Sequence, residues 1–430
     1  MTMAETISRS QMEAEKPELT LGFIPLSDCA PLIIAVEQGF FASEGLGVTL
    51  SREPSWANIR DKVCLGLLDG AQMLAGMPIA SSLNAEGLNR PMLTAFSLSL
   101  NGNAITVSNR LYQRLLELDP EAMSAQPITA RALARLIRQD QTDGAPPLRF
   151  AMVYPYSSHH YLLRYWLSAE GIDPDRDLQL IVVPPPRMVD YLRGGMIDGY
   201  CVGEPWNTRA IEDDIGQALV ASYDIWNNHP EKVFGVTVEW AERYPQTHLM
   251  VLRALLRAAQ WVDQPENRLE TIDILARSEY LNESIEVLKA GLLGQFRYRT
   301  REEPRPMPDF HVFQRYCANY PWLSHAEWIM TQMIRWKQVK PTIDIHKMAS
   351  SIYRPELYRQ AAGSLGLPCP PMERKQEGVH AMPWLLTSPR ETFPMGPDCF
   401  IDRHTFDPSD PMNYLNNISL PKGNHFRDLH

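Results

Sequence analysis

The chain has 430 residues, of which 44% are hydrophobic, so it is long enough for two or three domains with sizeable cores. Its 41 basic and 51 acidic residues give a net charge of −10, which argues against a broad nucleic-acid surface, because such a surface needs clustered Lys and Arg. None of the six cysteines lies in a C-x-x-C pair, which argues against a metal or redox site and favours free thiols in a reducing compartment.

The N-terminal segment is polar and acidic, and we expect a disordered lead over residues 1–17. It lacks the apolar h-region of a secretory signal, and no uninterrupted apolar run reaches transmembrane length. These features predict a cytoplasmic protein, unless the true start codon lies upstream of the given one.

Strands and helices are expected to alternate through the first half of the chain. A buried strand at 19–26 precedes a helix for which Ser27 or Asp28 could be the cap. The pattern then predicts strands and helices in the following order: strand 47–50, helix 59–68, strand 92–100, crossing 101–107, strand 148–155, helix 160–169, strand 178–186, helix 188–196 and strand 198–202. From about residue 247 the chain is mostly helical, and after residue 367 it is rich in Pro, Asp, Asn and Met.

This alternation predicts an α/β protein with two lobes, mainly parallel sheets, and a ligand cleft between the lobes. We assign 18–103 and about 204–367 to lobe I with a helical extension, 104–203 to lobe II, and 368–430 to a tail that wraps on the surface. The architecture alone does not distinguish an enzyme from a receptor.

Motifs for catalysis, nucleotides or metals are absent from the sequence. There is no G-x-S-x-G elbow, no H-E-x-x-H and no Walker or Rossmann glycine pattern. His159 and His160 are adjacent, so on a helix they would point about 100° apart and would not easily share a metal. We therefore predict no catalytic residues, no metal site and no cofactor.

Polar residues instead follow the predicted strands, in the zone where open α/β sheets bind ligands. Trp56, Asn103 and His159 can donate hydrogen bonds, Lys232 supplies a positive charge, and the backbone near Gly203 can add donors. One lysine with neutral donors fits a small monoanion better than a phosphate, for which arginine forks are expected. Each residue also has an ordinary reading: Trp56 as a packing residue, Asn103 and Gly203 as turn residues, His159 as a cap or core residue, and Lys232 as a surface lysine.

Several segments resemble the nitrate/bicarbonate-binding protein family of ABC importers. They include SWANIRDKV, NGNAITVS, VVPPPRMVDYLRGGMIDGYCVGEPWN, HPEKVFG and WIMTQMIRW, and the resemblance runs in order through about 18–420. It implies a two-lobed, type II periplasmic-binding-protein-like fold with a helical C-terminal extension and an oxyanion in the cleft. The nitrate site of the family falls on Trp56, Asn103, His159, Val202, Gly203 and Lys232.

Within that resemblance, nitrate importers carry glutamine where this chain has the shorter Asn103. The bicarbonate branch has an acidic residue at the place of Lys232 and uses calcium there, so the lysine favours nitrate or nitrite and implies no calcium. Without an export signal, the chain looks like the NasS-type cytoplasmic nitrate/nitrite sensors of assimilation operons. These are understood to control a NasT-like partner, an RNA-binding antiterminator with an ANTAR domain, and the resemblance predicts no direct nucleic-acid or membrane binding.

Two alternatives remain open from the sequence. The first is a secreted nitrate-binding receptor of an ABC importer, which an upstream signal sequence would support. The second is an enzyme of the thiamine-precursor-synthase type, which needs reactive His and Cys side chains in the cleft; only His159, His160 and Cys201 could contribute them.

Overall fold

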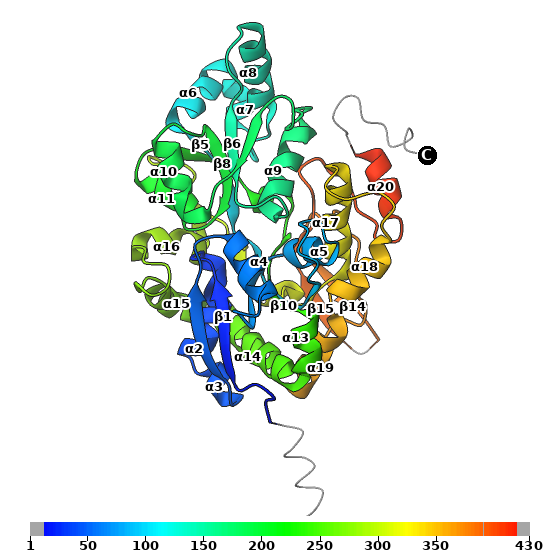
Figure 1. Ribbon diagram of the computed structural model, residues 1–430. Helices are drawn as coiled ribbons and strands as arrows, with labels where there is room; N and C mark the ends of the chain where they lie inside the picture. Colours follow the sequence, from blue (N-terminus) through cyan, green and yellow to red (C-terminus); the bar gives the residue numbers. More distant parts are fainter. Residues whose placement is uncertain (1–12, 390, 419–430) are drawn as a thin grey trace, which may run out of the picture.

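The computed structural model describes residues 13–389 and 391–418, and it has two α/β lobes with a C-terminal extension along one side (Figure 1). Of the predicted lead 1–17, residues 1–12 lie outside the described part, as do residues 419–430 of the predicted tail. The two-lobed α/β fold expected from the strand–helix alternation is confirmed.

Lobe I contains a six-stranded sheet in the order β13-β4-β10-β3-β1-β2. Its strands are β1 (Glu18–Phe23), β2 (Gly47–Arg52), β3 (Gly70–Leu74), β4 (Met92–Asn101), β10 (Pro230–Thr237) and β13 (His311–Val312). β1 is parallel to β2 and β3, whereas β10 runs antiparallel to both β3 and β4.

Lobe II contains a five-stranded sheet in the order β7-β6-β8-β5-β9. Its strands are β5 (Asn103–Ser108), β6 (Arg149–Met152), β7 (Gln179–Val182), β8 (Gly199–Gly203) and β9 (Gly216–Ala221). β6 is parallel to β7 and β8, but β5 is antiparallel to β8 and β9.

Two sequence predictions about the lobes are wrong. The boundary at residue 203 placed β9 in lobe I, yet β9 pairs with β5 in the lobe II sheet, so the chain returns to lobe I only after Ala221. The sheets are also mixed rather than mainly parallel. The reason is that β5 and β10 each begin where the chain crosses between lobes, and each therefore runs against the strands already present.

Helices bury the apolar faces of both sheets. In lobe I, α14 (Pro245–Asp263) packs on α2 (Ala30–Glu37), so that Ile33 and Leu255 share one core. In lobe II, α9 (Ser158–Ala169) packs beside β8. Among the described residues, no helix is both long and apolar enough to cross a membrane.

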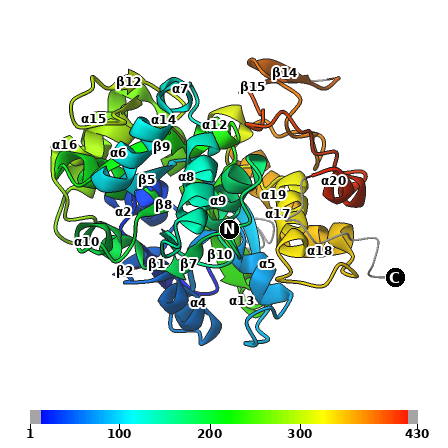
Figure 2. The same ribbon diagram turned by 90° about the horizontal axis from the view of Figure 1, so that it is seen from above.

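The C-terminal extension is built around α17 (Leu323–Arg335), whose residues are all buried. It continues through α18 (Ile345–Ile352), α19 (Pro355–Ser364), the hairpin of β14 (Trp384–Thr387) and β15 (Thr392–Met395), and α20 (Pro411–Asn417). Seen from above, this extension lies along one side of the two lobes, with the hairpin at its outer corner (Figure 2).

An aromatic cluster holds the extension against the lobes. The ring of Trp226, in the segment between β9 and β10, lies 4.5 Å from Trp328 of α17 and 4.7 Å from Phe400, between ring centroids. The hydroxyl of Tyr165 on α9 donates to the Asp402 carboxylate at 2.8 Å. The described part of the tail is therefore packed against both the crossing segment and lobe II, because burying these rings removes a large apolar area from water.

Candidate anion site between the lobes

Two helices begin beside the cleft between the lobes. The side chain of Ser55 caps α4 (Trp56–Cys64) by accepting from the Asn58 N–H at 3.3 Å, so Trp56 is the first helical residue rather than a loop residue. Ser157 caps α9 in the same way, by accepting from the His160 N–H, which places His159 in the first helical turn. A helix N-terminus carries partial positive charge, which favours a nearby anion.

Lys232 is fully buried and pairs with two carboxylates. Its Nζ lies 2.7 Å from Asp28 Oδ2 and 2.6 Å from Glu231 Oε1, and all three side chains are 0% exposed. The same ammonium lies 5.5 Å from the centroid of the Trp56 ring, within cation–π distance. The sequence analysis considered only neutral donors beside Lys232 and did not anticipate the two carboxylates, which a buried ammonium needs as opposite charge.

A β-bulge explains why Glu231 and Lys232 reach the same site. Consecutive side chains on a regular strand point to opposite faces of the sheet. The pairing of β10 with β4 shifts register on both sides of Lys232, which locally breaks this alternation. On a regular strand, Glu231 would point away from the face on which Lys232 lies, so strand periodicity gave no reason to select it. The irregular pairing of β10 brings Glu231 to the side of Lys232.

Asn103 and Gly203 bring lobe II to the site. They face each other at the ends of β5 and β8, and the Asn103 amide nitrogen donates to Glu231 Oε2 at 2.7 Å. A Cβ on Gly203 would lie 3.2 Å from Asn103 Oδ1 and 3.6 Å from Asp28 Oδ2, so this glycine lets the lobes approach closely. Val202 precedes Gly203 on β8; it pairs with Ala104, and its carbonyl oxygen accepts from the Asn207 amide.

His159 is the least satisfied polar group of the site. It is fully buried, and neither ring nitrogen has a hydrogen-bond partner, although Nδ1 lies 3.4 Å from Glu231 Oε1. The indole N–H of Trp56, the hydroxyl of Ser27 and Oδ1 of Asn103 also lack partners. Asn103 Oδ1 can only accept, whereas the Trp56 indole, the Ser27 hydroxyl and the His159 ring can donate. Unpaired buried donors are costly, so these three near one ammonium indicate a place for a ligand that accepts hydrogen bonds.

The pKa values of these groups are shifted by burial and by one another. Burial lowers the pKa of His159 to about 3, although Glu231 partly opposes this shift. Burial alone would raise the pKa of Glu231, but attraction to His159, Lys232 and His229 lowers it to about 2. Burial raises the pKa of Asp28, which Lys232 opposes, while the two carboxylates outweigh burial and raise the pKa of Lys232.

Three residues of the site were not singled out from the sequence: Asp28, Gln72 and Glu231. Asp28 was considered only as a helix cap, but it lies in the short 3₁₀ turn Ser27–Cys29 and accepts a hydrogen bond from the Gln72 amide. Gln72 in turn accepts from the Ile24 backbone N–H at 2.9 Å. A polar residue inside an otherwise apolar strand such as GAQML is the signal that could have found Gln72.

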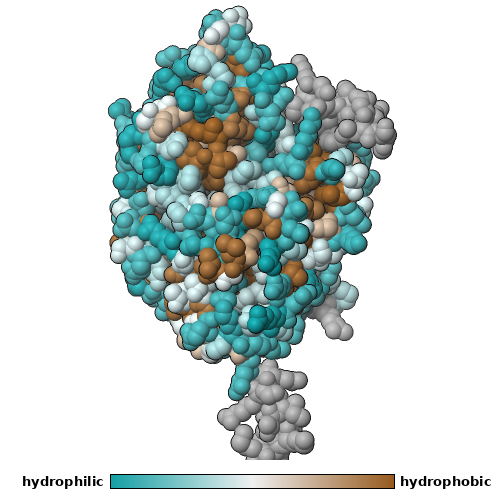
Figure 3. All heavy atoms as spheres, in the orientation of Figure 1, coloured by the Kyte–Doolittle hydropathy of each residue, from teal (hydrophilic) through white to brown (hydrophobic). Residues whose placement is uncertain are grey.

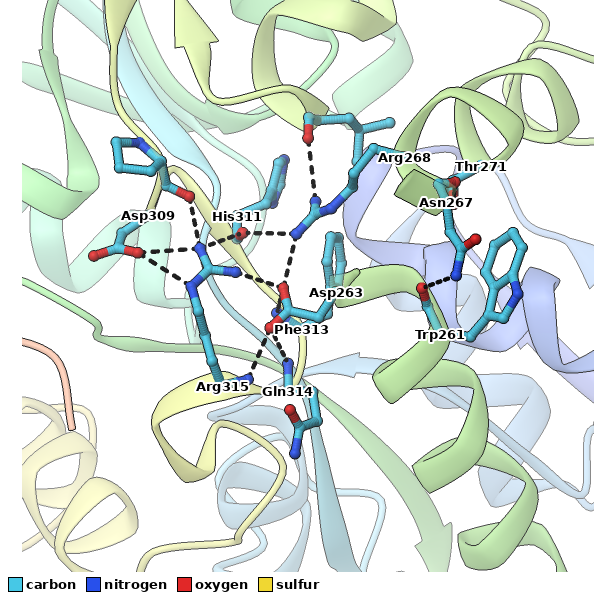
Figure 4. A network of polar contacts seen from close by, with 12 residues as sticks. Trp261, Asp263, Asn267, Arg268, Thr271, Asp309, His311, Phe313, Gln314 and Arg315 are labelled. Carbon is cyan, nitrogen blue, oxygen red and sulfur yellow. Dashed lines mark hydrogen bonds and ion pairs between the residues drawn. The ribbon is translucent and has the colours of Figure 1, made fainter. Parts of the chain in front are cut away.

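The first crossing between the lobes is a strained turn at Asn101 and Gly102, with φ of 62° and 93°. A Cβ on Gly102 would lie 2.3 Å from the His311 ring, so glycine is required there. The backbone around His311 is in turn held by Asp263, whose carboxylate pairs with Arg268 at 2.8 Å and Arg315 at 2.6 Å (Figure 4).

The second crossing between the lobes, residues 222–229, is hydrogen-bonded to the start of β5, which follows the first crossing. The Ser222 hydroxyl accepts from the backbone N–H of Asn103 at 3.2 Å and contacts His229 Nε2 at 2.8 Å. A third contact joins the lobes directly, because the Ser27 N–H donates to the Glu204 carbonyl at 2.8 Å. Both crossings therefore meet beside the site, as expected for a hinge whose motion opens or closes the cleft.

The site is poorly suited to catalysis by Cys201. Burial raises the pKa of this thiol well above its ordinary value, so the nucleophilic thiolate is disfavoured. In the part of the chain that the structure describes, no group of three or more His, Cys, Asp or Glu side chains is arranged to hold a metal ion.

Comparison with known proteins identifies relatives over nearly the whole chain. The NMT1-like family model matches residues 12–276. The nitrate import ATP-binding protein NrtC of Synechocystis sp. strain PCC 6803 is 39% identical over 408 residues, covering 94% of this chain and 56% of that protein. The chain thus spans little more than half the length of this relative.

Two nitrate-binding proteins match along most of their own length. The nitrate/nitrite binding protein NrtA of Nostoc sp. strain PCC 7120 is 31% identical over 421 residues, covering 96% of this chain and 89% of that protein. The crystal structure of the periplasmic nitrate-binding protein NrtA from Synechocystis PCC 6803 superposes with a TM-score of 0.83 at 29% identity, covering 95% of this chain and 100% of that one. The chain therefore belongs to the NMT1-like family and, within it, to the nitrate- and bicarbonate-binding receptors.

Proposed function

We propose that this protein binds nitrate or nitrite in the cleft between its lobes and acts as a cytoplasmic sensor that controls a NasT-like RNA-binding antiterminator. One observation carries the anion proposal: the buried Lys232 ammonium is surrounded by the unpaired donors of Trp56 and His159, which come from different lobes. An oxyanion that accepts from both lobes stabilises the closed form, because it binds that form more tightly than the open one.

Calorimetry tests the ligand directly. Nitrate and nitrite should bind to the wild-type protein, and a hundredfold excess over Kd should raise the free energy of unfolding by about 2.7 kcal/mol. Lys232→Met should abolish this ligand-induced stabilisation, whereas Lys289→Met, which changes a partly exposed lysine on α16 (Ile285–Leu292), should preserve it. An unchanged response in the Lys232 variant would refute the assignment of the site.

Bicarbonate is a second candidate ligand, and one observation favours it. Asp28 and Glu231 place two carboxylates beside Lys232, and the hydroxyl of bicarbonate could donate to one of them, which nitrate cannot do. Titration of bicarbonate under the same conditions distinguishes the two ligands. Binding of bicarbonate without any response to nitrate or nitrite would refute the nitrate proposal.

The location proposed for the sensor, inside the cell, is supported by the similarity to NrtC, because ATP-binding proteins use the ATP of the cell interior. The rival role is a secreted import receptor, which the similarity to periplasmic NrtA supports equally. Fractionation of the native cells with an antibody against this protein separates the two. Recovery in the periplasmic or membrane fraction would refute the sensor proposal.

A partner could recognise the face that includes both lobes. Exposed apolar side chains follow α4 in lobe I, where Leu65 and Leu67 are 74% and 63% exposed, and lie on β7 in lobe II, where Val182 is 50% exposed. On the face seen in Figure 3, apolar side chains are exposed on both the upper and the lower part of the molecule. A partner that contacts both lobes would sense closure, because closure changes the spacing between the two groups of side chains.

Co-precipitation with a purified NasT-like protein tests this part of the proposal. The complex should form without nitrate and dissociate when nitrate is added. The double variant Leu65→Ser/Leu67→Ser should weaken the complex, whereas Leu269→Ser, on the exposed face of α15 (Arg268–Leu275), should not. A complex that nitrate leaves intact would contradict ligand control of the partner.

A further inference from the structure

The anion site contains more negative than positive charge. Two carboxylates, Asp28 and Glu231, share one ammonium, Lys232, and no part of the three side chains is exposed. A monoanion that entered this space would add a second excess negative charge next to the first. Like charges repel strongly in a buried site, where solvent does not screen them, so a binding site of this composition needs one more positive charge.

His159 is placed to supply that charge. Its ring is fully buried with Nδ1 3.4 Å from Glu231 Oε1, and neither nitrogen is engaged in a hydrogen bond. A neutral imidazole has one donor, whereas a protonated one has two. Protonation would therefore allow Nδ1 to donate to Glu231 and Nε2 to donate to a bound oxyanion.

The other titratable groups around His159 are less suited to hold a proton. Asp28 Oδ1 already accepts a hydrogen bond from Gln72, and Oδ2 forms the ion pair with Lys232, which protonation of the acid would weaken. His229, in the segment before β10, uses Nδ1 for the Pro230 carbonyl at 3.0 Å and Nε2 for the Ser222 hydroxyl.

Four further groups belong to this ion cluster or interact with its Glu231 and Lys232. Lys232 on β10 repels a proton on His159, and Glu231 beside it attracts one. On β8, the Cys201 thiol stays protonated because burial raises its pKa well above the ordinary value. On β13, burial lowers the pKa of His311 to about 3, so that imidazole is neutral at physiological pH.

We propose that the cleft takes up its monoanion together with one proton, which His159 holds between Glu231 and the anion. This inference rests on the proposed function, because it requires that an anion binds here. Burial lowers the pKa of His159 to about 3, so the imidazole is neutral before an anion binds and the proton comes from solvent. A bound anion raises this pKa, so affinity is greatest at low pH and decreases as pH rises.

Calorimetry with sodium nitrate in PIPES, HEPES and Tris buffers at pH 7 tests the proposal, because these buffers release protons with different enthalpies. The observed binding enthalpy should vary with buffer ionisation enthalpy with a slope of one proton per nitrate. The dissociation constant should rise about tenfold per pH unit between pH 6.5 and 7.5, which is the limit for linkage to one proton. Binding with a slope of zero overturns the inference but leaves the anion site intact, whereas no binding of nitrate or nitrite overturns the proposed function and this inference together.

Two matched variants locate the proton. His159→Gln retains a polar amide but cannot titrate, so nitrate should bind it more weakly and without proton uptake. His160→Gln changes the next residue of the same helix, where both ring nitrogens already have partners in Pro155 and Arg164, and it should retain the uptake of one proton. Uptake of a full proton by the His159 variant would overturn the assignment to His159. The wild-type measurement tests the proton itself even if a variant does not fold.

Discussion

Replacing Lys232 by methionine should show how strongly the stability of the protein depends on the ammonium between Asp28 and Glu231. The substitution keeps the length and apolar stem of the side chain and removes the charge. Asp28 and Glu231 then remain fully buried without the cation that lies 2.7 and 2.6 Å from them. Removing one partner of a buried ion pair typically costs about 3–5 kcal/mol, because the other charge is left uncompensated, and we expect about 4 kcal/mol at pH 8.

The loss in the free energy of unfolding of Lys232→Met should depend on pH in a defined direction. Without Lys232, burial and mutual repulsion raise the folded-state pKa of the two carboxylates above their unfolded values of about 4. Groups with raised folded-state pKa values favour the folded protein at low pH, and this contribution is lost as pH rises through the folded-state values. The variant should therefore be closer to wild type at pH 5 than at pH 8.

Urea denaturation followed by circular dichroism at the two pH values measures these differences. The triple variant Asp28→Asn/Glu231→Gln/Lys232→Met, in which no charge remains, should recover most of the stability, since neutral replacements of buried ion pairs are often tolerated. A loss below about 1 kcal/mol for Lys232→Met, or an equal loss at pH 5 and pH 8, would refute the reasoning that the cluster is charged and mutually compensated.

The other predictions concern Trp56 in the anion site, Gly102 in the first crossing between the lobes, and the buried Glu204. Trp56→Phe removes an unpaired indole N–H and should weaken nitrate binding about tenfold, a typical value for one hydrogen bond, and equal affinity by calorimetry would make Trp56 a packing residue only. Gly102→Ala should destabilise the protein by at least about 2 kcal/mol in urea denaturation, because φ is 93° and the added Cβ would meet His311. Gly144→Ala, with a φ of 69° and open space around the added Cβ, should cost about 1 kcal/mol, and equal losses in both variants would contradict the predicted clash. Burial raises the pKa of Glu204 from 4.5 to about 7, so wild type should lose about 1 kcal/mol relative to Glu204→Gln between pH 6 and pH 8, and parallel pH profiles would contradict this.

The sequence by itself determined the class of the fold and most of the candidate site residues. Alternating strands and helices predict lobes with ligand-binding loops at strand ends, because periodicity and turn residues are local properties of the chain. Trp56, Asn103, His159, Gly203 and Lys232 could be placed beside strand ends in this way, and the family resemblance gathered them, with Val202, into one site.

The tertiary structure decided what surrounds those residues. Glu231 joins Lys232 because a bulge in β10 cancels the alternation of side chains, and Asp28 joins them because the turn after β1 lies beside Gln72 of β3. These pairings depend on strand register and on segments far apart in sequence, which local periodicity does not encode. The charge of the site, and with it the proton linkage proposed for His159, is a property of the fold, because it is set by groups that meet only when both lobes are assembled.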